Sequence, residues 1–334
     1  MGLTYREAGV DIAAGEAAVK AIKTLAQSTY NDNVLTELGL FGGCYQIPLH
    51  EYEEPVLVAS TDGVGTKLLI ALAMDKHDTV GQCLVNHCVN DILTTGARPL
   101  FFLDYIGTGK LKPETVKAIV SGIAQACREN RCALIGGEMA EMPDLYRQKE
   151  YDLVGTIVGI TAKNRLLIKR VQPGDVLIGL PSTGLHTNGY TLARKVLLQK
   201  YHLSDYLAEL GMPLGAALLQ VHRSYLPYVE PLLSHAGLHA MSHITGGGIV
   251  GNTMRVIPQG CELFIDWSAW EIPPLFQIIQ KTGELDWTEM RKVFNLGIGF
   301  ILIVAKTAVT EVLNILRERE SQPIIIGEVR KGEA

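Results

Sequence analysis

Apolar and polar positions along most of this chain follow two alternating spacings. Short runs rich in Val, Ile, Leu and Phe have the length of β-strands, and between them lie longer segments with apolar residues at three- and four-residue steps, as in amphipathic helices. The predicted strands are 55–60, 99–106, 132–136, 152–162, 175–180, 261–267, 298–305 and 323–329. The predicted helices are 79–95, 113–129, 189–200, 215–234, 273–282, 287–293 and 307–319. Together they predict an α/β or α+β fold.

The length of the chain predicts two domains. Its 334 residues are about twice the common domain size. The polar stretch Lys163-Asn164-Arg165 follows the last predicted strand of the first half. We therefore expect domains at residues 1–163 and 164–334, with a cleft between them.

Composition excludes several classes of partner and places the chain in the cytoplasm. The net charge is −5 and no long basic block occurs, so nothing suits a nucleic-acid backbone. Charged residues within the first twenty positions exclude a signal peptide, and apolar runs such as 297–305 are too short to cross a membrane. The six cysteines form no C-x-x-C pair, which favours reduced thiols.

The first candidate site follows the strand predicted at 55–60. Residues 60–67 read STDGVGTK, so Asp62 lies at a strand end. Gly63 and Gly65 permit close approach of a ligand to the backbone, and Lys67 supplies a charge suited to phosphate. A lone Asp-Gly pair is often a plain turn.

Two further acidic positions favour a binding site over a plain turn. Asp91 ends the segment NHCVND within an apolar helix, and His87 lies on the same helix face one turn earlier. The alternative to a functional Asp91 is an ordinary helix-face acid that is solvated. Gly136 and Gly137 lead into Glu138 after another strand. Asp62, Asp91 and Glu138 are therefore candidate ligands for Mg²⁺, with Glu141 less favoured.

The second half contributes two polar loops. Residues 181–190 read PSTGLHTNGY and offer His186 as a proton carrier and Asn188 as an amide, although a loop histidine is often incidental. Residues 242–248 read SHITGGG and lead directly into a predicted helix. Successive glycines at a helix start favour a phosphate.

Seven segments of the chain together resemble the aminoimidazole ribonucleotide (AIR) synthetase family, in its order and spacing. The resemblance spans residues 5 to about 330, and seven weak motifs in register make coincidence very unlikely. The segments are Tyr5–Ile12, Asp62–Lys67, Val89–Ile92, Pro99–Tyr105, Gly136–Pro143, His186–Tyr190 and His243–Gly248.

The resemblance implies a fold and a reaction. The N-terminal mixed sheet would form a barrel across a homodimer, and the C-terminal half would be an α/β sandwich. The reaction would convert formylglycinamidine ribonucleotide and ATP into aminoimidazole ribonucleotide, ADP and phosphate. ATP is needed because an amide oxygen leaves poorly until it is phosphorylated, after which the amidine nitrogen closes the ring.

The resemblance also implies roles for individual residues. Catalysis would fall to Lys67, Asp91 and His186, and Mg²⁺ would be held by Asp62, Asp91 and Glu138. The substrate's ribose 5-phosphate would lie on the loop 245–248. The expected contacts with ATP or substrate phosphate are Asp62, Gly63, Gly65, Thr66, Lys67, Asn90, Gly136, Gly137, Asn188, Thr245, Gly246, Gly247 and Gly248.

The chain departs from the family pattern at several positions. Met139 stands where a threonine is usual, Thr95 where a glutamine is common, and the loops 30–33 and 37–43 differ in basic and glycine content. A non-catalytic nucleotide-binding paralogue, a metal-dependent phosphohydrolase and another member of the superfamily remain alternatives. A hydrogenase-maturation protein would end in a reactive cysteine, whereas the last cysteine here is Cys261.

Overall fold

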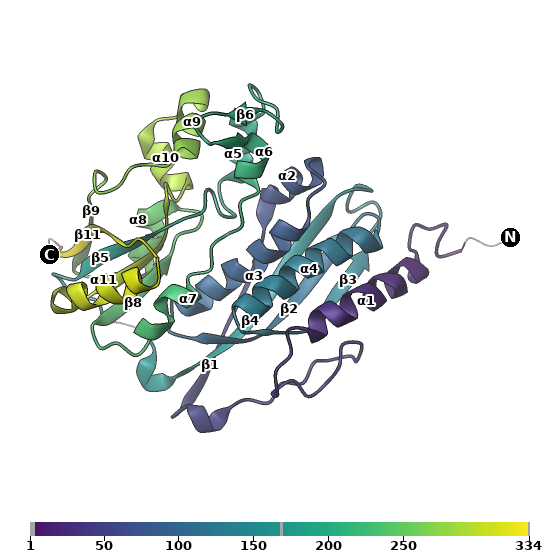
Figure 1. Cartoon of the computed structure of the whole chain (residues 1–334), viewed down its shortest axis with the longest axis horizontal. Helices are drawn as coiled ribbons and strands as arrows, with labels where there is room; N and C mark the ends of the chain where they lie inside the picture. Colours follow the sequence, from purple (N-terminus) through teal and green to yellow (C-terminus); the bar gives the residue numbers. More distant parts are fainter. Residues whose placement is uncertain (1–3, 168–169, 333–334) are drawn as a thin grey trace.

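The computed structural model describes residues 4–167 and 170–332 of the chain. Two α/β halves lie side by side, each built on its own sheet (Figure 1). The predicted boundary at 163/164 follows the end of β4 (Tyr151–Ala162) and precedes β5 (Val176–Pro181). One buried hydrophobic cluster extends through both halves, so their cores are continuous.

The N-terminal half is a four-stranded mixed sheet with helices on one face. Its strand order is β1-β4-β2-β3, with β2 and β3 parallel and the other pairs antiparallel. The strands are β1 (Pro55–Gly63), β2 (Arg98–Thr108), β3 (Ala133–Glu141) and β4. The helices are α1 (Ile12–Gln27), α2 (Leu68–Ala73), α3 (Asp78–Leu93) and α4 (Pro113–Glu129), and α1, α3 and α4 cover the sheet (Figure 1).

The opposite face of this sheet is only partly covered within the chain. Along β4, Leu153, Gly155 and Ile157 are buried toward the helices, whereas Val154, Thr156 and Val158 between them are partly exposed. The neighbouring β1 residues Ala59 and Thr61, which pair with Val158 and Thr156, are exposed. This alternation is typical of a sheet with one packed and one free face.

The C-terminal half is a five-stranded antiparallel sheet with helices around it. Its order is β8-β10-β5-β11-β9, and the strand β10 (Ile298–Val304) is buried along its whole length. The other strands are β8 (Leu238–His243), β9 (Cys261–Ile265), β11 (Ile324–Lys331) and the small pair β6 (Tyr206–Leu207) and β7 (Met212–Pro213). The helices are α5 (Tyr190–Leu197), α6 (Leu214–Leu218), α7 (Leu226–Val229), α8 (Gly248–Thr253), α9 (Pro274–Gly283), α10 (Trp287–Val293) and α11 (Val309–Glu318).

The helix predicted at 215–234 is wrong as a single element. The segment forms α6, then an irregular stretch, then the short α7 and a 3₁₀ turn at Glu230–Leu232. Pro227 and Pro231 stand at the starts of the last two, where a missing N–H is tolerated. The irregular stretch 219–225 passes between the two halves and brings His222 into the site described below.

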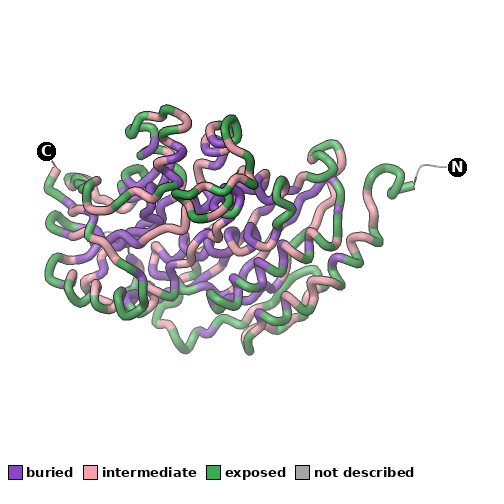
Figure 2. Tube along the Cα trace, turned by 45° about the horizontal axis from the view of Figure 1, so that its top comes forward, coloured by how far each residue is buried: buried purple, intermediate pink, exposed green. Residues whose placement is uncertain are grey.

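Burial is concentrated in the two sheets and between the halves, whereas the outer loops are exposed (Figure 2). Among the described residues, no helix is both long and apolar enough to cross a membrane.

Candidate functional site at the junction of the two halves

Strand β1 and helix α3 bring Asp62 and Asp91 close together on one face of the sheet. Asp62 lies near the end of β1, and its Oδ1 accepts the backbone N–H of Gly63 at 2.6 Å. Asp91 lies near the end of α3, and its Oδ2 accepts the hydroxyl of Ser60 at 2.9 Å. His87, one turn earlier on α3, has its Nε2 2.9 Å from Asp62 Oδ2 and 3.8 Å from Asp91 Oδ2.

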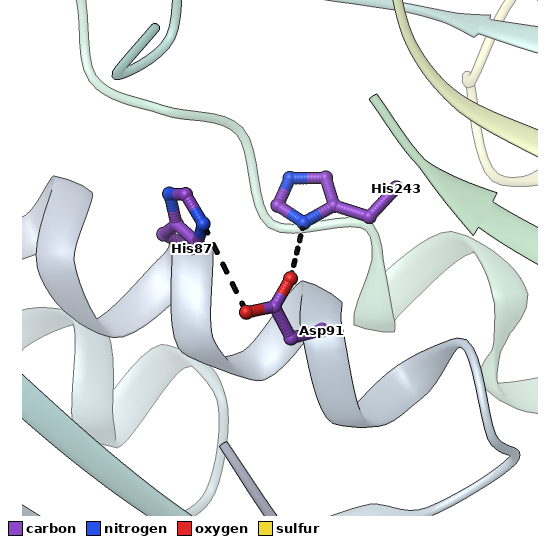
Figure 3. A group of neighbouring side chains, drawn as sticks. All are labelled: His87, Asp91 and His243. Atoms are coloured by element: carbon purple, nitrogen blue, oxygen red, sulfur yellow. Dashed lines mark hydrogen bonds and ion pairs between the residues drawn. The ribbon is translucent and has the colours of Figure 1, made fainter. Parts of the chain in front are cut away.

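Strand β8 of the other half completes this arrangement. His243 ends β8, and its Nδ1 lies 2.8 Å from Asp91 Oδ1. His87 and His243 both face the Asp91 carboxylate, one from α3 and one from across the junction (Figure 3). One ligand atom from each of these three residues falls within 4.8 Å of the other two, a spacing suited to a bound cation.

Both carboxylates are held in the ionised form. Burial opposes ionisation of Asp62, but the His87 imidazole 2.9 Å away lowers the pKa of Asp62 below the ordinary value. Burial also opposes ionisation of Asp91, but the hydrogen bond and charge of His243 lower the pKa of Asp91. Two anionic groups at a junction of domains suit a cation or a positively charged ligand group.

Four histidines and a threonine form a buried network behind the carboxylates. Thr187 Oγ1 lies 2.7 Å from His87 Nδ1 and 3.2 Å from His222 Nδ1, and His222 Nε2 lies 3.0 Å from His243 Nε2. The His186 ring stacks on His222 at a centroid distance of 4.0 Å. Burial lowers the pKa of His186 and His222 well below the ordinary value.

Sequence reasoning missed His222. The periodicity predicts one amphipathic helix here, in which His222-Arg223-Ser224 would occupy an ordinary polar turn. A contrary signal is present in the sequence, because Pro227 and Pro231 make a continuous helix through this segment unfavourable.

The structure places Lys67 between the two halves. Its side chain is fully buried, and its ammonium donates to the carbonyl oxygens of His186 at 2.9 Å and Gln220 at 2.5 Å and to Cys83 Sγ at 3.2 Å. All three N–H bonds therefore have partners within the protein. The lysine joins the 3₁₀ turn Gly65–Lys67 to the C-terminal half.

His186 is likewise placed differently from the expectation of a proton carrier in a cleft. It is fully buried, in a left-handed backbone conformation with φ +60, and its Nε2 accepts the backbone N–H of Thr183 at 3.0 Å. The ring supports His222 from behind. The side chain is therefore enclosed by protein.

Glu138 does not join Asp62 and Asp91 within one chain. The pairing register places Asp62, Gly155, Asp104 and Gly137 in one row across the sheet, so their side-chain positions share a face. Glu138 follows Gly137 and therefore points to the opposite face. β1 and β3 are also the two outer strands, about 14 Å apart by ordinary strand spacing.

Gly136, Gly137 and Glu138 instead line a separate cavity of 580 Å³ with the loop 37–43. Asp104 is also among its lining residues, and burial raises the pKa of Asp104 to about 7. A Cβ on Gly137 would lie 2.5 Å from Asp104 Oδ1, so the glycine leaves room for that carboxyl group. In the sequence, Asp104 stands out only as part of the family resemblance.

The remaining predicted residues gather at the junction. Thr66 Oγ1 lies 2.9 Å from Thr191 Oγ1, and a Cβ on Gly65 would lie 3.7 Å from Thr187 O, so the first loop meets the loop 181–190. Asn188 Oδ1 would lie 3.3 Å from a Cβ on Gly246. The loops around Asp62, Asn188 and Gly246 therefore adjoin one another.

Asn90 has a structural place in this junction. Its Oδ1 accepts the backbone N–H of Tyr225 at 2.9 Å, and its Nδ2 donates to the carbonyl oxygen of Arg223 at 2.8 Å. Both groups of the amide therefore hold the stretch 219–225 in place.

The glycine loop before α8 has a rigid base and an exposed tip. The Asn252 amide donates to the carbonyl oxygens of Thr245 at 3.2 Å, Gly246 at 3.3 Å and Gly248 at 2.8 Å. Gly246 and Gly247 are exposed, and Gly247 has φ +104, a conformation that favours glycine.

Comparison with known proteins identifies the family of both halves. Residues 43–161 match the model of the AIR synthase related protein N-terminal domain, and residues 172–334 match that of its C-terminal domain. The phosphoribosylformylglycinamidine cyclo-ligase of Pseudothermotoga lettingae is 47% identical over 334 residues, covering 100% of this chain and 98% of the relative.

Solved structures share the fold at low sequence identity. Thiamine-monophosphate kinase from Stenotrophomonas maltophilia aligns with a TM-score of 0.71 at 17% identity, covering 95% of this chain and 94% of that one. A hydrogenase maturation protein HypE in complex with ATP aligns with a TM-score of 0.63 at 18% identity, covering 92% and 84%. Both domain matches and the full-length relative lead to one conclusion: this chain belongs to the AIR synthase related family.

Proposed function

We propose that this chain is an ATP-dependent cyclo-ligase that closes formylglycinamidine ribonucleotide to aminoimidazole ribonucleotide, releasing ADP and phosphate, in purine biosynthesis. The observation that carries the proposal is the full-length 47% identity to a relative named for this reaction. The junction of the two halves adds an ionised carboxylate pair beside an exposed glycine loop.

Asp62 and Asp91 are the groups that would hold the divalent cation accompanying ATP. Their oxygens are anionic and converge at one place, which fits the hard oxygen ligands that Mg²⁺ prefers. A bound cation would offset the negative charge of the transferring phosphoryl group. A HypE protein of the same fold is described in complex with ATP, which supports ATP as the nucleotide here.

The chain's own residues orient the reactants. The exposed backbone of Gly246 and Gly247 offers N–H groups to the substrate's ribose phosphate, with the Asn188 amide beside it. Lys67 and Asn90 fix the two halves against each other, so that β8 and α3 keep a constant separation. Catalysis then consists mainly of positioning and electrostatics.

Replacing Asp91 with Asn tests this function. The amide keeps the shape of the side chain but loses the charge, so we expect turnover in a coupled assay of aminoimidazole ribonucleotide formation to fall at least about 100-fold. The matched control is Glu209→Gln, an exposed acid far from the junction, which should keep full activity. Full activity in the Asp91 variant would remove this carboxylate from the reaction.

A homodimer and a cytosolic location complete the proposal. The free face of the N-terminal sheet, around Ala59, Thr61 and Val158, is the surface that a second copy would cover. Glu138 and Asp104 both line a cavity at the far edge of the same sheet. All six cysteines are free, which suits a reducing compartment.

A further inference from the structure

Another cavity lies within the N-terminal half, at the edge of the sheet where β2 ends and β4 begins. Its volume is 320 Å³, which is enough for a small organic molecule. The cavity is enclosed by the end of α2, the end of β2, the first turns of α4 and the loop before β4. Of the described residues that line it, all belong to the N-terminal half and none is a candidate residue of the site at the junction.

The mouth of this cavity is basic. Lys110 and Lys112 come from the loop between β2 and α4, and Lys149 comes from the loop before β4. All three side chains are exposed, and none forms an ion pair with a described residue. The one carboxylate among the described lining residues is that of Asp75, which lies 3.1 Å from His77 Nε2. Three lysines against one carboxylate give the recess a positive potential that attracts an anion.

The inner wall of the cavity has an apolar part and a polar part. Ile106, Val116 and Ile119 are buried and supply the apolar part. Thr108 and Tyr151 are also buried and supply two hydroxyl groups. An inorganic anion would leave the apolar part without contacts, whereas the carbon atoms of an organic ligand would cover it. The lining therefore suits a ligand with an anionic end and a carbon skeleton.

The hydrogen bonds of the two buried hydroxyl groups leave them as acceptors. Thr108 Oγ1 already donates to two backbone carbonyl oxygens, both at 3.2 Å. The Asp75 carboxylate only accepts, so His77 Nε2 carries the proton and its Nδ1 accepts the O–H of Tyr151 at 2.9 Å. Burial raises the pKa of Tyr151, which keeps the phenol protonated. The free lone pairs of both oxygens can therefore accept hydrogen bonds from hydroxyl groups of a ligand.

We propose that this cavity binds a small organic phosphate whose carbon skeleton carries hydroxyl groups. The phosphate lies at the mouth, among Lys110, Lys112 and Lys149, since a dianion matches three lysines better than a single carboxylate does. The hydroxyl groups lie inside and donate to Thr108 and Tyr151, because acceptors at the inner wall would repel the phosphate. The site is separate from the proposed reaction and does not depend on it.

Titration of the full-length protein with ribose 5-phosphate tests this site, with the isoleucine δ1 methyl signals followed by NMR. Ile106 and Ile119 line the cavity, whereas Ile249 follows the glycine loop at the junction and reports binding there. Replacing each isoleucine with valine assigns its signal. We expect saturable shifts of Ile106 and Ile119 with a Kd of about 1 mM or tighter. Inorganic phosphate should bind more weakly, and free ribose should cause no saturable shift.

Charge-removing variants locate the phosphate. Lys110→Gln and Lys149→Gln should each raise the Kd for ribose 5-phosphate by about 10-fold, because each removes a charged partner of the phosphate. The matched control is Lys117→Gln, an exposed lysine of α4 that does not line this cavity, which should change the Kd by less than about twofold. The methyl spectrum of each variant without ligand shows that the variant is folded.

Four results would overturn the inference. The first is the absence of any saturable shift at Ile106 and Ile119. The second is a shift at Ile249 alone, which would support phosphate binding by the glycine loop but not by this cavity. The third is an equal loss of affinity in Lys110→Gln and Lys117→Gln, which would indicate only long-range attraction by net charge. The fourth is equal affinity for ribose 5-phosphate and inorganic phosphate, or for ribose 5-phosphate and ribose.

Discussion

At the scale of single residues, Lys67 shows how burial changes a role. A lysine beside two glycines indicated a phosphate contact, but its ammonium is enclosed by two carbonyl oxygens and a thiol from elements far apart in sequence. A buried ammonium needs such partners because its desolvation is costly. Removing it would leave those carbonyl groups without a donor.

We therefore predict that Lys67→Met acts mainly on stability. The free energy of unfolding measured in urea should fall by about 2–4 kcal/mol, since buried acceptors lose their donor. The exposed Lys195→Met should change it by less than about 0.5 kcal/mol. Unchanged stability together with a raised KM for ATP would show that the lysine reaches the nucleotide after all.

Asp104 is the second residue whose environment changes its chemistry, because burial raises its pKa to about 7. Burial favours the neutral carboxyl group, so between about pH 4 and pH 7 the folded state keeps a proton that the unfolded state releases. This contribution is therefore fully present below about pH 4, is lost as the pH rises toward 7 and changes no further above it.

Asp104→Asn, which cannot ionise, should remove this pH dependence. As the pH rises from 4 to 8, we expect the free energy of unfolding of the variant to increase relative to that of the unmodified protein, by on the order of 4 kcal/mol at most. Thermal or urea unfolding at half-unit pH steps measures the difference. Parallel stability curves for the two proteins would mean that Asp104 is ionised in the folded state.

At the scale of elements, glycines set how closely the helices approach. A Cβ on Gly122 of α4 would meet the carbonyl oxygen of Asp78 at the start of α3, and a Cβ on Gly81 would meet that of Ile119. The two helices therefore cross backbone to backbone, which fixes the position of α3 and hence of His87 and Asp91. The helical periodicity predicted both helices but gave no information on this close crossing.

Alanine at Gly122 should separate these helices. The added methyl group meets a backbone oxygen that cannot rotate away, so we expect a loss of about 1–3 kcal/mol or more in the free energy of unfolding. Gly15→Ala in α1 is the matched control, because nothing lies within 4 Å of its Cβ position and helix propensity should give a gain of about 0.5–1 kcal/mol. Equal effects at the two sites would contradict the close crossing.

At the scale of the whole molecule, the free face of the N-terminal sheet is the surface on which a second copy is proposed to bind. Ala59→Asp adds a charge at a position that is exposed in the single chain, so folding should be preserved while association through this face is weakened. Sedimentation velocity should show a dimer for the unmodified protein and a shift toward monomer of at least about tenfold in Kd for the variant. Ala208→Asp, in the turn between β6 and β7, should leave the dimer unchanged; a dimer in both variants would place the interface elsewhere.

The sequence by itself determined the class of fold, most strands and helices, and the family, because periodicity and motif order are local properties of the chain. It also singled out Asp62, Asp91 and the glycine loop as candidates, since acids and successive glycines next to apolar segments are visible in the order of residues. Only the tertiary structure decided that Glu138 lies across the sheet from Asp62, that Lys67 is enclosed, and that His87, His222 and His243 meet around Asp91. These outcomes depend on strand order, register and the docking of two halves, which bring together residues more than a hundred positions apart and which local pattern does not encode.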